Sequence, residues 1–145
     1  MTKRTATFLL IGLLTLTARQ APAELVVVAS PKSGVEHLSK QEVIFLFMGR
    51  WRLLPSGIQA APIDQAIDSP ERADFYRRLV NKEPSEIKAY WSRLVFSGGA
   101  RPPYAMENRE ELLRLIGNNP GAIGYLDRSQ VDSRLRIVFE FPATP

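Results

Sequence analysis

Ser69, Pro70 and Glu71 form the part of the sequence best suited to bind an anion. A serine followed by proline and a carboxylate is typical of a helix start, because serine caps free backbone N–H groups and proline suits the first helical position. The free N–H groups and the positive dipole at such a start can hold a phosphate or a similar oxyanion. Ser69 would add a hydroxyl, and Arg72 would add a positive charge if its side chain turned inward. The same residues also fit a simple helix cap, in which Glu71 complements the helix dipole.

A second candidate is the loop of Ser97, Gly98 and Gly99, which follows an amphipathic helix. Glycines allow close approach of the backbone to a ligand, and successive N–H groups can form an anion-binding nest. The loop lacks the Gly-Lys-Ser/Thr ending of a P-loop, so a nucleotide is disfavoured. It also fits a glycine cap at the end of a helix. The predicted ligand-binding residues are Ser69, Arg72, Ser97, Gly98 and Gly99.

Three residues oppose anion binding at the helix start. Pro70 has no N–H group to donate. Glu71 places a negative charge where the anion would lie, and Asp64 is close in sequence. Because like charges repel strongly in a partly buried site, these carboxylates would weaken the binding of a dianion.

No catalytic residue, metal ligand or cofactor is predicted. The chain has no cysteine, which excludes disulfides, thiolate catalysis and zinc sites built on cysteine. His37 is the only histidine and has no partner at the spacing of metal ligands, and no Gly-x-Ser-x-Gly nucleophile elbow is present. The run 50–52, Arg-Trp-Arg, could stack on a base, but one short motif is more often a solvated turn. We therefore expect a binding protein and not an enzyme.

The N-terminal residues 1–23 have the pattern of a secretory signal peptide. A basic start is followed by 12 uncharged residues, 6–17, and Ala21-Pro22-Ala23 fits a cleavage site after Ala23. A helix of that length spans about 18 Å, too short for a hydrocarbon core of about 30 Å. Three of the 19 basic residues belong to this leader, so 16 basic and 15 acidic residues remain, a net charge of +1. Such a chain has no global field to attract nucleic acid. Because the chain has a secretory leader and no cysteine, we expect a periplasmic location.

Hydrophobic periodicity predicts one mixed α/β domain over residues 24–145, with helices packed on a small sheet. Ser39 and Glu42 form a capping box, which favours a helix over a strand for the apolar residues that follow. Gly117 is expected to end the last helix. The predicted strands are 25–29, 58–63, 122–126 and 135–139, and the predicted helices begin at Ser39, Ser69, Pro84 and Asn108.

Ordered motifs over 38–138 resemble the family of phosphate-type periplasmic substrate-binding proteins. This resemblance implies a periplasmic-binding-protein-like fold of the second type, and the length of the chain implies a single lobe. Larger members have two lobes that close over an anion, usually phosphate, for an ABC importer. The motifs are Leu38-Ser39, 44–49 (Ile-Phe-Leu-Phe-Met-Gly), 62–65 (Pro-Ile-Asp-Gln) with Ser69, Arg72 and Phe75, 96–98 (Phe-Ser-Gly), and 120–125 (Pro-Gly-Ala-Ile-Gly-Tyr).

Two functions follow from the sequence. The first is a periplasmic protein that binds phosphate or a related small anion for ABC-type uptake, with a transporter permease as partner. The second is an envelope protein-interaction or sensory module that kept the fold and lost the ligand, with Trp51 and Arg52 as contacts. A homodimer that completes a cleft from two single lobes would reconcile the two.

Overall fold

A computed structural model describes residues 24–142 of the chain. The predicted signal peptide and its cleavage site lie outside these residues. The strands are β1 (Leu25–Ala29), β2 (Ala61–Gln65), β3 (Tyr104–Met106), β4 (Ala122–Asp127) and β5 (Arg136–Glu140). They form one sheet in the order β3-β2-β4-β1-β5. β1 runs antiparallel to β4 and β5, whereas β2 runs parallel to β3 and β4, so the predicted mixed sheet is confirmed.

The helices begin where the sequence predicted. Ser39 and Glu42 form the complete capping box of α1, and Ser69 and Asn108 cap the next and the last helix through their side-chain oxygens. In the described part of the chain, no helix has both the length and the apolar character needed to cross a bilayer. The helices are α1 (Lys40–Phe47), α2 (Pro70–Val80), α3 (Pro84–Phe96) and α4 (Arg109–Asn118), with a short 3₁₀ turn, η1 (Arg128–Gln130).

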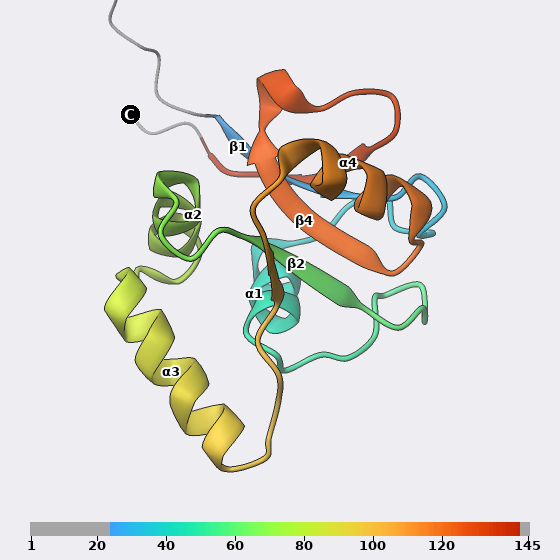
Figure 1. The fold of residues 1–145 in the computed structure, drawn as a ribbon. Coiled ribbons are helices and arrows are strands. Elements are labelled where there is room, and N and C mark those ends of the chain that lie inside the picture. The colour runs from blue at the N-terminus through green and yellow to red at the C-terminus, as the bar shows by residue number, and fades with distance from the viewer. Residues whose placement is uncertain (1–23, 143–145) are drawn as a thin grey trace, which may run out of the picture.

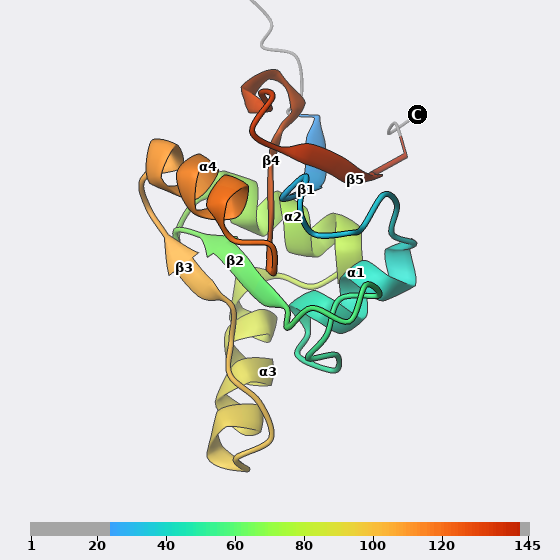
Figure 2. The same cartoon turned by 90° about the vertical axis from the view of Figure 1, so that its right-hand side faces the viewer.

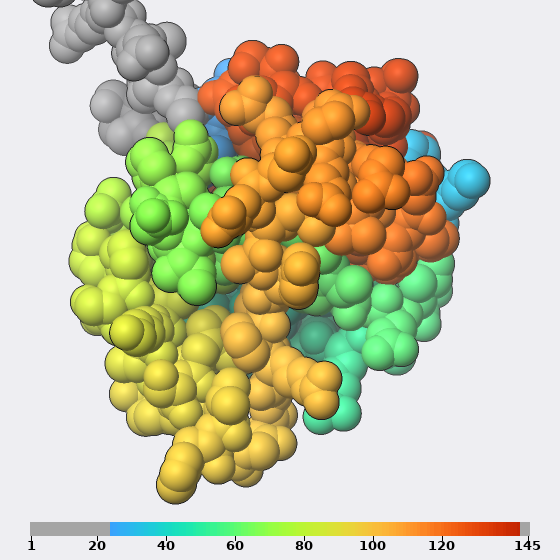
Figure 3. All heavy atoms as spheres, viewed as in Figure 1, coloured from blue at the N-terminus to red at the C-terminus, as the bar shows by residue number. Residues whose placement is uncertain are grey.

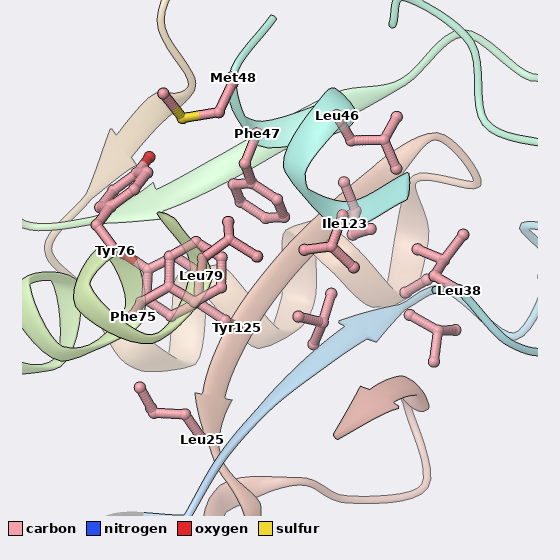
Figure 4. Packing of buried hydrophobic residues seen from close by; sticks show 14 of the residues in the cluster. Leu25, Leu38, Leu46, Phe47, Met48, Phe75, Tyr76, Leu79, Ile123 and Tyr125 are labelled. Carbon is pink, nitrogen blue, oxygen red and sulfur yellow. The ribbon is translucent and has the colours of Figure 1, made fainter. Parts of the chain in front are cut away.

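Helices cover both faces of the sheet (Figures 1 and 2). On one face, α1 and α2 pack against alternate residues of β1 and β4 and bury the larger cluster of apolar side chains. Figure 4 shows its centre, where Phe75 stacks on Tyr125 with ring centroids 3.7 Å apart and Phe47 meets Phe75 edge-on. On the other face, α4 buries Leu112, Leu113 and Ile116 against the opposite side chains of β1 and β4. α3 stands further from the sheet and reaches away from it at its C-terminal end.

Three features differ from the prediction by more than two residues or in kind, and the ends of β4 and β5 differ by a single residue. β2 begins at Ala61, because Ile58 belongs to the preceding turn, where its carbonyl accepts from Leu54 N–H at 2.8 Å. β3 was not predicted. Gly117 does not end α4, which continues to Asn118; a Cβ at Gly117 would come within 3.3 Å of the Arg134 carbonyl, so packing explains the glycine.

Candidate functional site

Two helix starts meet at one edge of the sheet. β2 and β3 are parallel neighbours, so the helices that follow them, α2 and α4, both begin beside the carboxyl ends of these strands. In open α/β sheets this edge is where ligands commonly bind. A cavity of about 180 Å³ lies there, which we call the strand-end cavity. Its lining includes Gln65, Ser69, Glu71, Met106, Glu107, Arg109, Leu112 and Gln130.

Ser69 and Arg109 are the groups in the strand-end cavity that favour an anion. Ser69 Oγ accepts a hydrogen bond from Arg72 N–H at 3.1 Å, which is the predicted helix cap. Its hydroxyl hydrogen has no acceptor among residues 24–142 and can turn toward a ligand. Arg109 opens α4 and supplies the one positive side chain in the lining. The carboxylates of Glu71 and Glu107 line the same cavity and oppose it.

Arg72 does not line this cavity, in contrast to the prediction that it faces the anion. Its Nε donates to Asp64 Oδ2 at 2.9 Å, and both side chains are buried. Its guanidinium also lies 5.1 Å from the centre of the Tyr76 ring. The positive charge that sequence reasoning assigned to the ligand is therefore paired with a neighbouring carboxylate.

The Asp64 carboxylate is the centre of a buried polar cluster. Besides Arg72, it accepts from Tyr76 Oη at 3.0 Å, from Tyr125 Oη in a short hydrogen bond, and from Gln65 N–H at 3.0 Å. Burial and the Asp64 charge raise the pKa of both tyrosines well above the usual value. Burial lowers the pKa of Arg72, but the attraction and hydrogen bond of Asp64 outweigh this effect and leave it above the usual value. Both phenols thus stay protonated and donate to Asp64 near neutral pH, and Arg72 stays charged, which suits a structural role.

The structure separates Ser97, Gly98 and Gly99 from Ser69. Ser97 caps the end of α3, and its Oγ donates to the Leu94 carbonyl at 2.9 Å. Gly98 has the left-handed φ of +70°, as a helix-ending glycine should. Gly98 and Gly99 line a different and larger hollow, whereas Ser69 lines the strand-end cavity. The two groups of predicted ligand-binding residues therefore do not surround one small anion.

That larger hollow is a groove of about 780 Å³, which we call the aromatic groove. Its walls are the 49–63 segment, the C-terminal half of α3 and the 98–104 loop; Figure 3 shows the depression between the orange loop and the green segment. Its lining includes Trp51, Arg52, Trp91, Val95, Arg101 and Tyr104. The sequence singled out Trp51 and Arg52 but not the other four.

Two residues of the strand-end cavity, Glu107 and Arg109, were not predicted from the sequence, because the strand β3 that precedes them was not predicted. Glu107 and Arg109 reach the strand-end cavity only because the three-residue β3 pairs with β2 and sets the start of α4 beside that of α2. The predicted cap at Asn108 was the one local signal in the sequence for the helix start that Arg109 brings to this cavity. Among residues 24–142, no cluster of three or more His, Cys, Asp or Glu is arranged to hold a metal ion.

Comparisons with known proteins agree on the fold. No family model and no curated protein matches the chain. An ABC-type phosphate transport receptor from Vibrio cholerae has a TM-score of 0.64 and 13% identity, over 80% of this chain and 45% of that one. PstS from Borrelia burgdorferi has a TM-score of 0.62 and 14% identity, over 83% and 49%. A protein from Clostridium perfringens described as a phosphate ABC transporter substrate-binding protein, with bound phosphate, has a TM-score of 0.62 and 15% identity, over 80% and 44%.

These likenesses show the fold. The chain has an α/β fold of the periplasmic-binding-protein type and spans about half the length of the solved structures that it matches, as one lobe would.

Proposed function

We propose that this chain is an exported, single-lobe binding protein that takes phosphate or a similar small oxyanion into the strand-end cavity and works with an ABC transporter permease. The observation that carries the proposal is the convergence of two helix starts, at Ser69 and at Arg109, on one cavity of about 180 Å³. Free N–H groups and the positive ends of two helix dipoles favour an anion there. The phosphate in the Clostridium perfringens structure of the same fold adds support.

The cavity chemistry also sets the expected strength of binding. The carboxylates of Glu71 and Glu107 face the same space, and the charge of Arg72 is held by Asp64. A monoanion is therefore favoured over a dianion, and affinity in the micromolar to millimolar range is expected in place of the tight capture that two closing lobes provide.

Calorimetric titration of residues 24–145 with phosphate, sulfate and acetate tests this function. We expect a saturable heat with one anion bound per chain for phosphate, which is partly a monoanion near neutral pH, and weaker binding of sulfate, which is a dianion. The substitution Arg109→Gln should weaken the affinity for the anion. The control Arg136→Gln, on the exposed surface of β5, should leave the affinity unchanged. Absence of heat and of any thermal shift with all three anions at millimolar concentration would remove the anion site.

Export after Ala23 belongs to the same proposal. Mass spectrometry of the full chain expressed in a bacterium should find a periplasmic product that begins at Glu24. A product that keeps residues 1–23 in the cytoplasm would contradict this part of the proposal without touching the anion site.

A second candidate function is a protein-interaction module that kept the fold and lost the ligand. The specific observation in its favour is that the aromatic groove, at about 780 Å³, is larger than the strand-end cavity, at about 180 Å³, with 38% of Trp51 and 67% of Tyr104 exposed. Affinity capture from an envelope extract should then yield a partner that Trp51→Ala loses. Equal capture by both forms would remove Trp51 from this function.

A further inference from the structure

The aromatic groove has the composition of a protein-binding surface. Its floor and walls are apolar, from Leu46, Trp91, Val95 and the Pro102-Pro103 pair, and the side chains of Trp51 and Tyr104 stand exposed at its margin. Tryptophan, tyrosine and arginine are the residues most enriched where proteins bind one another. Large exposed apolar side chains grouped around one hollow are uncommon on a surface that binds nothing.

Charge around the groove is of one sign. The walls of the groove, the 49–63 segment, the C-terminal half of α3 and the 98–104 loop, contain four basic residues and no acidic one, although the chain after residue 23 is nearly neutral. Arg52 and Arg101 line the groove, are exposed, and form no ion pair with another residue of 24–142. The groove thus has an apolar floor between free positive charges, which complements a segment with apolar side chains and carboxylates.

Specific contacts fix the walls of the aromatic groove relative to one another, so its surface is preformed. Tyr90 Oη donates to the Met48 carbonyl at 2.6 Å, which ties α3 to the end of α1. Gly49, at φ +74°, lies under the Trp91 ring, and a Cβ there would come within 2.8 Å of Trp91 Cη2. Trp91 Nε1 is buried and has no hydrogen-bond partner among the described residues. A preformed surface binds at lower entropic cost.

We propose that the aromatic groove docks an acidic segment of a partner protein, with apolar side chains between Trp51 and Trp91 and carboxylates on Arg52 and Arg101. This inference rests on the second proposed function and names its surface and the chemistry of its partner. It is independent of the strand-end cavity, which shares no lining residue with the groove.

The two tryptophans of the chain, Trp51 and Trp91, both line the groove, so intrinsic fluorescence reports directly on its occupation. The probe is a displayed library of random 15-residue peptides, selected on immobilised 24–145 and then titrated as free peptides. We expect selected sequences to combine Asp or Glu with Leu, Phe or Trp, and to shift the tryptophan emission. Arg52→Glu/Arg101→Glu should weaken them at least tenfold, Trp51→Ala should weaken them similarly, and Arg136→Glu should leave them unchanged.

Circular dichroism and thermal unfolding check that each variant folds, and binding is compared among folded variants only. The inference would be overturned if no peptide were enriched or if the enriched peptides were basic. It would also be overturned if the groove variants bound the selected peptides with unchanged affinity. Concentration-dependent self-association lost in Arg52→Glu/Arg101→Glu would assign the groove to a second copy instead. A fluorescence shift with anionic lipid vesicles but not with peptides would assign it to a membrane surface. If a captured envelope partner ignores every groove variant, the inference fails while the second proposed function stands.

Discussion

Arg72 and Asp64 form a buried ion pair in which the guanidinium Nε donates to the carboxylate Oδ2 at 2.9 Å. The pair joins the first turn of α2 to the end of β2, next in sequence to Gln65, which lines the strand-end cavity. It explains why an arginine at a helix start need not serve a ligand. It also fixes the position of the Ser69 cap relative to the sheet.

Removal of one partner of this pair should destabilise the protein strongly. Asp64→Asn leaves the Arg72 charge buried without a counter-charge, and we expect the free energy of unfolding to fall by about 3–5 kcal/mol. Urea unfolding measures the loss. In the double variant Asp64→Asn/Arg72→Gln the loss should be smaller than the sum of the two single losses. A change below about 1 kcal/mol for Asp64→Asn would contradict the buried pair.

Tyr76 and Tyr125 predict a loss of stability at alkaline pH. Burial and Asp64 raise the pKa of both phenols, so the folded state keeps protons that the unfolded state releases near pH 10. Their contribution is therefore complete below about pH 10 and is lost as the pH rises further, by up to about 1.4 kcal/mol per pH unit for each group. Tyr125→Phe should flatten this decline and should also cost about 1.5–3 kcal/mol at neutral pH for its lost hydrogen bond to a charge. An equally steep decline in the variant would show that Tyr125 does not cause it.

Gly49 and Gly57 form a matched pair for testing the floor of the aromatic groove. Both have positive φ, +74° and +88°, but a Cβ at Gly49 meets the Trp91 ring whereas one at Gly57 meets nothing within 4 Å. Gly57→Ala should cost about 1 kcal/mol of backbone strain, and Gly49→Ala should cost about 1–3 kcal/mol more. Thermal unfolding compares the two, and the Gly49 variant should also shift the tryptophan emission. Equal losses would mean that Trp91 does not press on Gly49.

Glu71 and Arg109 should change anion affinity in opposite directions. Glu71→Gln removes a repelling charge at the start of α2 and should tighten the dissociation constant for phosphate about twofold to fivefold. Arg109→Gln should weaken it about threefold to fivefold, the range of a near-surface charge contact. Both effects should shrink as sodium chloride is raised. Changes of the same sign would place the anion outside the strand-end cavity.

Local sequence signals predicted the helices well. Ser39, Ser69 and Asn108 each cap a helix through contacts within three residues, so their effect can be read from the sequence alone. The strands were harder. β3 is three residues long and exists because it pairs with β2 from 41 residues away, and no periodicity can show in so short a run.

The site was predicted only in part, because its decisive contacts are distant in sequence. Ser69 and Glu71 were recognised as a helix start, but the partner of Arg72 became clear only when Asp64, Tyr76 and Tyr125 met in space. The separation of Gly98 and Gly99 from Ser69 follows from the direction of α3, which leads away from the sheet. A turn motif fixes a local conformation but not the neighbour that it faces.

The most direct test of the account is a phosphate titration of ¹⁵N-labelled 24–145, followed amide by amide. Fast-exchanging shifts should concentrate at the first turns of α2 and α4, at Ser69, Glu71 and 109–111, while Gly98 and Gly99 stay in place. Shifts confined to the glycine loop, or no shift at millimolar phosphate, would contradict an anion site at the carboxyl ends of β2 and β3.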